Sequence, residues 1–266
     1  MSENPNITVT DDDPIRVWDE VVCIQKKMNQ SLGKQVLDSI LTLKDTQYIF
    51  DQNYLELTTH LKRFQDKKFV KELQYDKSEM PRTVIHRDTS KYLFNYLSAA
   101  RALFYHTFSF MKKYEGTPFD TQCTNEVKQR IPRGINEFIR ILRNLLVHQT
   151  IPRNSLQFTL GNVSTKKITW NTTLVLDITD SKRTSDIWNE ESWEYIQTHY
   201  SSSDIDIKKF CDDYHQIITE YYSWFFSALK EYHANDLKEY EELKNEYELK
   251  ASEYNRRQNQ YHHQKK

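Results

Sequence analysis

The sequence predicts a mainly α-helical protein that carries one small β-hairpin. Residues that interrupt helices are scarce, with 4 Gly and 6 Pro in 266 residues, so long helices are expected. Apolar residues recur at three- and four-residue steps through most of the chain, which is the period of an amphipathic helix. One stretch differs, because at about residues 155–176 the period changes to two, as it does in a β-strand.

Composition excludes several classes of protein. The 17 Tyr, 13 Phe and 5 Trp can build a substantial core, and a net charge of −1 argues against a polycation that binds duplex nucleic acid nonspecifically. The three cysteines are far apart and form no CxxC, which favours a reducing compartment over a disulfide framework or a zinc site. Without a signal peptide or a long apolar run, we expect a cytoplasmic protein that does not interact with a membrane.

The N-terminal part divides into a tail and a helical region. Residues 1–13 are polar and acidic, and we expect them to be a disordered tail. Helical periodicity extends from Ile15 to about Phe64, whereas residues 65–81 are polar, end in a proline and are interpreted as a loop. Residues 14–81 are therefore predicted to form an N-terminal helical region.

The central part contains the two clearest helices. The first extends from about Asp88 to Tyr114 and should end at the Gly-Thr-Pro of residues 116–118. A short helix over 119–130 should follow. The next helix, from about Ile135 to Gln149, ends before Pro152. Its expected core residues are Ile135, Phe138, Ile139, Leu142, Leu145 and Leu146.

The C-terminal part begins with the predicted hairpin, which should pack on helices because an isolated hairpin is only marginally stable. A helix over 186–200 follows, and a long last helix should start near Asp204 or Asp206 and extend, in one interpretation without interruption, to about Arg257. Within residues 231–266, a polar tail, tyrosines recur every seven residues at Tyr240, Tyr247, Tyr254 and Tyr261. This spacing fits a short coiled contact or a solvated helix, and the charged positions between the tyrosines favour the solvated helix.

Polar side chains on the helix before Pro152 form the best candidate site. Arg140, Asn144 and His148 step by four and share one face, opposite the core stripe. Arginine matches phosphate oxygens, histidine transfers protons near neutral pH, and asparagine can hold either in place. Arg143 and His148 are about 140° and about 7.5 Å apart on an ideal helix, so a compact site needs a two-fold axis. Such residues are also ordinary on a solvent-facing helix side.

The segment at residues 138–148, FIRILRNLLVH, resembles the signature of the HEPN superfamily. In that signature an arginine is followed by a polar residue, often asparagine, by three variable residues and by a histidine. The preceding helix, which includes NYLSAARALFYHT at residues 95–107, is similar to the corresponding helix of a group of uncharacterised bacterial HEPN-like proteins. The order of the elements after the motif also matches that group, so the resemblance covers about residues 82–230.

The resemblance implies a HEPN-like helical bundle that forms a homodimer with its motif helices facing each other. It also implies a metal-independent endoribonuclease without a cofactor, in which an RNA 2′-hydroxyl attacks the adjacent phosphate. His148 would then be the general acid or base, Arg143 would bind the phosphate, and Asn144 would orient them. Many members act in toxin–antitoxin or antiphage systems, which implies an antitoxin or another regulatory protein as a further partner.

Two weaker candidates and two alternative functions stay open. Arg140 is a candidate binding residue, and His106, on the preceding helix, is either a partner of the site or a boundary histidine with its own hydrogen bond. No cluster with the spacing of metal ligands occurs near the motif, so no metal is expected. The alternatives are a non-catalytic HEPN-like binding or regulatory protein and a helical scaffold whose resemblance to the family is accidental.

Overall fold

The computed structural model describes residues 14–75, 80–148, 154–161, 169–177, 189–200 and 204–264. These residues are mainly helical, with one small sheet, as the sequence predicts. The chain forms two compact units, of which one comprises the residues up to Thr42 and those from Ser227 on, and the other extends from Leu43 to Phe226. Helices α2 (Leu32–Lys62) and α8 (Ile207–Tyr232) each contribute to both units.

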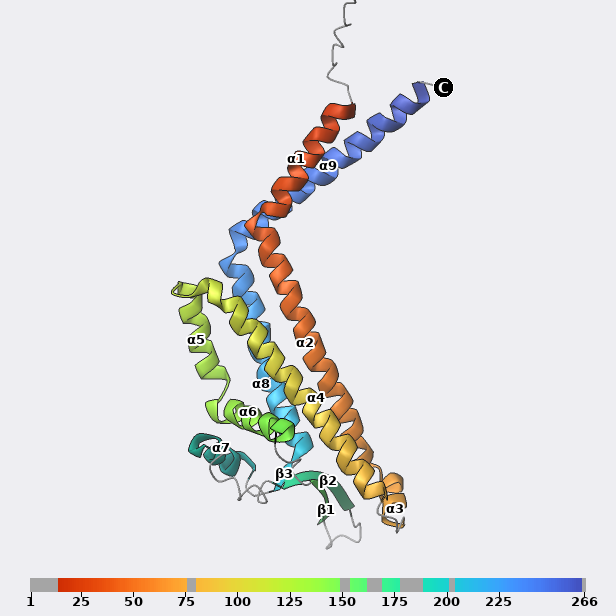
Figure 1. Cartoon of the computed structure of the whole chain (residues 1–266), viewed down its shortest axis with the longest axis vertical. Coiled ribbons are helices and arrows are strands. Elements are labelled where there is room, and N and C mark those ends of the chain that lie inside the picture. The colour runs from red at the N-terminus through yellow and green to blue at the C-terminus, as the bar shows by residue number, and fades with distance from the viewer. Residues whose placement is uncertain are drawn as a thin grey trace, which may run out of the picture. The chain divides into compact units, whose positions relative to one another are not determined.

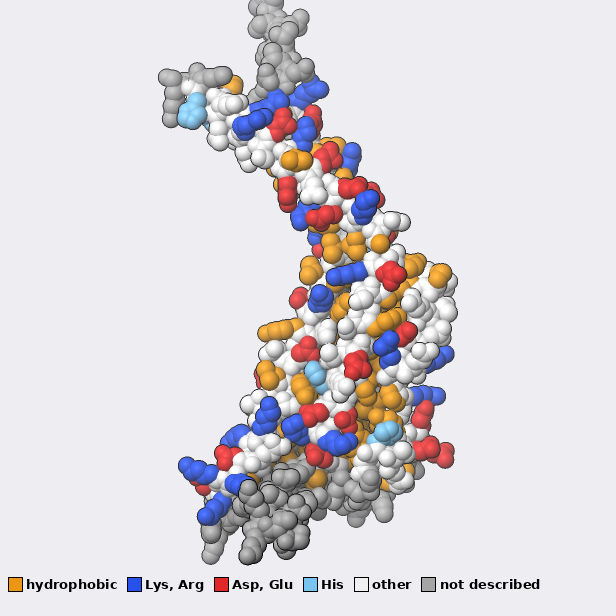
Figure 2. Space-filling view, turned by 180° about the vertical axis from the view of Figure 1, so that it is seen from behind, with side chains coloured by type: hydrophobic (Ala, Val, Ile, Leu, Met, Phe, Trp, Pro, Cys, Tyr) orange, Lys and Arg blue, Asp and Glu red, His pale blue; other side chains and the backbone are white. Residues whose placement is uncertain are grey.

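The first unit is built around a pair of antiparallel helices, α1 (Pro14–Gln30) and α9 (Ala234–Gln264), which lie side by side (Figure 1). The apolar stripe of α1 is buried and consists of Val17, Val21 and Ile24. The ring centroids of Trp18 and Tyr254 are 5.0 Å apart, and the Lys250 ammonium lies 2.7 Å from the Glu20 carboxylate. On the outside of this pair, acidic and basic side chains are interspersed (Figure 2).

This pairing decides between the two interpretations of the tyrosine repeat. The stripe that contains Tyr240, Tyr247 and Tyr254 is half-buried, so the polar tail makes a coiled contact and the favoured solvated helix is wrong. The reason is that α1 supplies a buried aliphatic stripe against which the half-buried tyrosines of α9 pack. The last long helix is also interrupted, because α8 ends at Tyr232 and α9 begins one residue after His233.

The second unit contains the remaining helices and the sheet. The predicted hairpin is confirmed, and β2 also pairs with a short strand that the sequence did not indicate, so that the described strands have the antiparallel order β1-β2-β3. Leu174, Val175 and Leu176 of β2 are buried. The elements are α3 (Lys67–Tyr75), α4 (Met80–Met111), α5 (Pro118–Arg130), α6 (Arg133–His148), β1 (Asn154–Gly161), β2 (Thr169–Asp177), α7 (Glu190–Tyr200) and β3 (Asp204–Asp206).

Aromatic side chains from α2, α4 and α8 form the centre of this unit. The ring centroids of Phe50 and Tyr96 are 5.2 Å apart, and the fully buried Tyr96 donates its hydroxyl hydrogen bond to the carbonyl of Cys211. The hydroxyls of Tyr222 and Thr107 are 2.7 Å apart and form a hydrogen bond with each other in the core.

None of the described helices is both long and apolar enough to cross a membrane.

The expected loop at residues 65–81 is wrong for most of its length. Helix α3 forms there, because the Asp66 carboxylate accepts a hydrogen bond from the Lys68 amide at 2.9 Å and the apolar side chain of Val70 is buried. Helix α4 begins at Met80, so Pro81 lies in its first turn, where a missing N–H costs no intrahelical bond. The predicted end of α4 is confirmed, since Gly116 has a φ of 76° and Thr117 caps α5.

A buried histidine in this unit should make stability depend on pH. His60 Nε2 lies 2.9 Å from the Thr89 hydroxyl, and both side chains are buried. Burial, aided by the nearby Arg63, lowers the pKa of His60 from its ordinary value of 6.5. The unfolded chain therefore takes up a proton first as the pH falls, so the free energy of unfolding should decrease below about pH 6.5.

This effect can be measured by urea denaturation of the wild type and of His60→Gln. The free energy of unfolding of each protein is determined at several pH values between about 8 and 5. Glutamine can keep a hydrogen bond to Thr89 but does not titrate. If both proteins lose the same free energy of unfolding between pH 7 and pH 5, His60 is not the group responsible.

Candidate functional site

Helix α6, which carries the motif, is held by packing against three other helices. Its buried residues are Gly134, Ile135, Phe138, Ile139, Ile141, Leu142 and Leu145. The Phe138 ring meets the Phe210 ring of α8 edge-on, with centroids 5.1 Å apart. Helix α6 also contacts α4 and α7. The core stripe that the sequence predicts on this helix is therefore confirmed, except that Leu146 is only half-buried.

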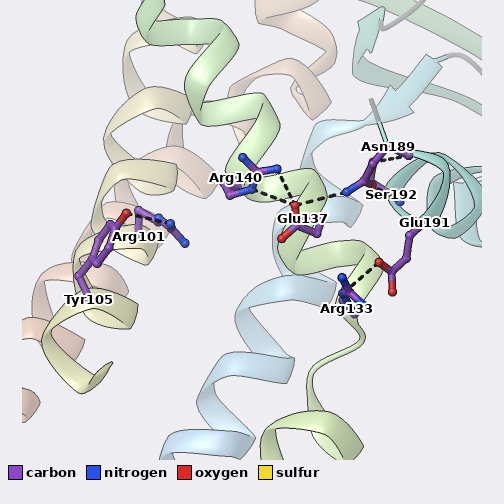
Figure 3. Close-up of polar contacts among 8 residues, drawn as sticks. All are labelled: Arg101, Tyr105, Arg133, Glu137, Arg140, Asn189, Glu191 and Ser192. Carbon is purple, nitrogen blue, oxygen red and sulfur yellow. Dashed lines mark hydrogen bonds and ion pairs between the residues drawn. The ribbon is translucent and has the colours of Figure 1, made fainter. Parts of the chain in front are cut away.

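Helix α7 approaches α6 very closely at Gly134. A Cβ atom at this position would lie 2.4 Å from the Cβ of Tyr195 and 2.8 Å from the carbonyl oxygen of Glu191. The crossing therefore requires a residue without a side chain. Next to it, the Arg133 guanidinium forms an ion pair with the Glu191 carboxylate at 3.0 Å (Figure 3).

The Arg140 side chain is engaged in an ion pair. Its Nε and one terminal nitrogen both donate to the same oxygen of Glu137, at 2.8 and 2.7 Å (Figure 3). The Asn189 amide donates to that oxygen as well, at 3.4 Å, while the Asn189 carbonyl oxygen of the side chain accepts from the Ser192 amide at the start of α7. Sequence reasoning missed the roles of Glu137 and Asn189; the three-residue spacing of Glu137 and Arg140 was the available signal for an ion pair.

The Arg143 side chain differs from Arg140, because part of it is buried without a partner. Its Nη1 makes a long contact of 3.4 Å with the side-chain oxygen of Asn144. Its Nε is buried and has no hydrogen-bond partner within the described residues. A buried donor in this state costs about 1–3 kcal/mol. Arg143 lies about 180° around α6 from Gly134, on the flank away from α7.

Helix α6 ends at His148, whose side chain lies outside the described part of the structure. The backbone nevertheless fixes its register, because α6 is helical through this residue. His148 is four residues after Asn144 and thus on the same side of the helix, whereas Arg143 is about 140° away. Within one chain the helix therefore aligns Arg140, Asn144 and His148 and separates His148 from Arg143.

His106 has a hydrogen-bond partner on a different helix from the motif. Its Nδ1 lies 2.9 Å from the Thr46 hydroxyl of α2, and its side chain is largely exposed on α4. Of the two interpretations of His106, this bond between described residues favours the boundary histidine with its own hydrogen bond. Arg101, also on α4, donates to the hydroxyl of Tyr105 at 2.9 Å (Figure 3).

Comparisons with protein-family models, with curated proteins and with solved structures each find no match to this chain. In the described ranges, no three side chains of His, Cys, Asp or Glu come together as a metal site would require. Function has to be inferred from the side chains of α6 and their surroundings.

Proposed function

We propose that the protein is a metal-independent endoribonuclease that acts as a homodimer through Arg143, Asn144 and His148. The observation that supports this most is the Arg143 guanidinium, whose Nε is buried without a partner among the described residues. The terminal nitrogens of this guanidinium suit phosphate oxygens, since the group is planar and always charged. The resemblance of the surrounding segment to the HEPN signature supports the type of reaction.

The proposed reaction needs no group other than side chains. The 2′-hydroxyl of the RNA attacks the adjacent phosphorus as its proton moves to a base, and the bond to the 5′-oxygen breaks as that oxygen receives a proton. The products are a 2′,3′-cyclic phosphate and a free 5′-hydroxyl. His148 is the base or the acid in this scheme, Arg143 stabilises the charge that develops on the phosphate, and Asn144 orients Arg143 through its side-chain oxygen.

A homodimer is proposed because one helix cannot bring Arg143 and His148 together. A two-fold axis next to α6 would place Arg143 of one copy near His148 of the other. The polar side of α6 is accessible for this purpose, since Arg133 is exposed and Asn136, Arg140 and Asn144 are only half-buried.

The test is incubation of the purified protein with RNA in the presence of EDTA, with analysis of the product ends and sedimentation at micromolar concentration. We expect cyclic phosphate ends and a dimer. Binding of RNA by a dimer that does not cut would instead favour a non-catalytic binding or regulatory protein. A monomer, or activity that EDTA abolishes and a divalent ion restores, would contradict the proposal.

Two substitutions of Arg143 should distinguish the contribution of its planar guanidinium geometry from that of its positive charge. Arg143→Ala should lower the cleavage rate by on the order of a hundredfold, because a charge-stabilising donor is lost. Arg143→Lys should restore part of the rate, since an ammonium keeps the charge but not the planar fork. Arg130→Ala is the control on α5, outside the polar side of α6; the Arg130 guanidinium is also paired with a carboxylate, that of Glu126, so the loss should be much smaller. Equal losses for both alanine variants would argue against a specific role for Arg143.

A further inference from the structure

Helix α4 and the turn after it present a stripe of aromatic and basic side chains that the proposed reaction does not use. Arg101, Tyr105, Phe108 and Lys112 follow one another at steps of four, three and four residues, so they share one side of the helix. Tyr105 is 55% exposed and Phe108 is 64% exposed, so two large rings lie next to each other on the surface of this helix. We call these four residues the α4 stripe.

Each ring of the α4 stripe has a cation beside it. The Arg101 guanidinium lies 4.3 Å from the centroid of the Tyr105 ring, and the Lys112 ammonium lies 5.4 Å from the centroid of the Phe108 ring. The order along the helix is therefore cation, ring, ring, cation, over a length of about 16 Å. The large exposed fractions show that the cations leave much of both rings open to solvent.

The segment of the chain that carries the stripe has charged side chains of one sign. No Asp or Glu occurs between Asp88 and Glu115, whereas four Lys or Arg residues occur there. This contrasts with the mixed charges along α1 and α9 (Figure 2). An occupant of the stripe should therefore be negatively charged and should offer flat faces to the rings.

The α4 stripe also lies on the helix that packs against α6. Phe94 and Ser98 continue the stripe toward the N-terminus of α4 at the same helical spacing, and they are half-buried, while Tyr105 and Phe108 are exposed. Figure 3 shows Arg101 and Tyr105 on α4 together with Arg140 on the neighbouring α6. The exposed rings are thus on a helix adjacent to the motif helix and outside the motif itself.

We propose that the α4 stripe binds single-stranded RNA, with bases stacked on Tyr105 and Phe108 and phosphates near Arg101 and Lys112. Surfaces for single strands combine aromatic stacking with cations in this way, and a duplex offers few bases because its bases are already stacked. A second copy of the chain fits less well, since a two-fold contact would bring the cations of one stripe against those of the other. The choice of RNA over DNA rests on the proposed function, whereas the argument for a surface that stacks bases is independent of it.

The test measures binding apart from cleavage. Fluorescence anisotropy of a labelled uridine 12-mer with 2′-O-methyl groups, which the proposed reaction cannot cut, gives the dissociation constant. Tyr105→Ala and Phe108→Ala should each weaken binding roughly tenfold, and Tyr105→Leu should not restore it, because leucine is apolar but has no flat π face. Tyr48→Ala is the matched control, since Tyr48 is a 63% exposed tyrosine on α2, about 200° around that helix from Thr46, which contacts α4. It should bind as the wild type does.

The possible outcomes distinguish the proposal for the α4 stripe from the nuclease proposal. If wild type binds the 12-mer and the two ring variants lose binding while folded by circular dichroism, the stripe stands even when no RNA is cut, and only the nuclease proposal fails. If the wild type cuts RNA but the ring variants bind as tightly as Tyr48→Ala, the stripe proposal is overturned and the nuclease proposal is not. Absence of binding by the wild type at micromolar protein and low salt, or ring variants that turn a dimer into a monomer, would also overturn it.

Discussion

His148→Ala should lower RNA cleavage by on the order of a hundredfold or more, while the fold and the oligomeric state stay unchanged. A general acid or base transfers a proton during the reaction, so its removal slows the chemical step. Folding should survive because His148 is the last residue of α6 and lies beyond Leu145, the last side chain of that helix that the structure describes as buried. Rates are to be measured with excess enzyme over RNA, so that substrate binding does not limit them.

Two controls make this result specific. His106→Ala removes a histidine that is hydrogen-bonded to Thr46 on another helix, and it should leave the cleavage rate nearly unchanged. A 2′-deoxy nucleotide at the cut site should block cleavage by the wild type, because the attacking hydroxyl is absent. If His148→Ala cuts as fast as the wild type, the assignment of His148 as the catalytic acid or base is wrong.

Phe138→Ala should have the largest effect on stability, a loss of about 3–5 kcal/mol in the free energy of unfolding. Phe138 is fully buried, and its ring meets Phe210 of α8 edge-on, so the substitution leaves a cavity between the motif helix and α8. Total stabilities are typically about 5–15 kcal/mol, so the loss approaches what a domain can tolerate. Activity should fall with the fraction of folded protein.

The measurement is urea denaturation followed by near-ultraviolet circular dichroism, with Phe138→Leu as the conservative variant. Leucine keeps much of the buried volume and should cost far less than alanine. An unchanged urea midpoint for Phe138→Ala would contradict the packing of α6 on α8.

Local periodicity was sufficient to predict most elements but not the contacts between distant ones. The core stripe of α6 and the hairpin were predictable, because both follow from the spacing of apolar residues within one short window. The coiled contact of the tail was not, because Trp18 and Tyr254 lie at opposite ends of the sequence. The helix at Lys67–Tyr75 was missed because Pro81 was interpreted as the end of a loop and not as the first turn of α4.

The candidate site, too, could be predicted from the sequence only in part. The motif assigned Arg143, Asn144 and His148 to one helix, and that helix is present. The different surroundings of Arg140 and Arg143 could not be predicted, since one partner of the Glu137 carboxylate, Asn189, comes from a distant part of the sequence. Likewise, the buried state of Arg143 Nε depends on neighbouring elements and not on the motif.

The pairing of α1 with α9 has a consequence for how the chain folds during synthesis. Val17, Val21 and Ile24 leave the ribosome before the second unit, but the helix that covers them, α9, follows all of that unit in the chain. At translation rates of about 5–20 residues per second, these side chains stay uncovered for on the order of ten seconds or more. The second unit can fold in that interval, so the nascent chain exposes an aliphatic stripe that a chaperone or a neighbouring nascent chain can bind before α9 is complete.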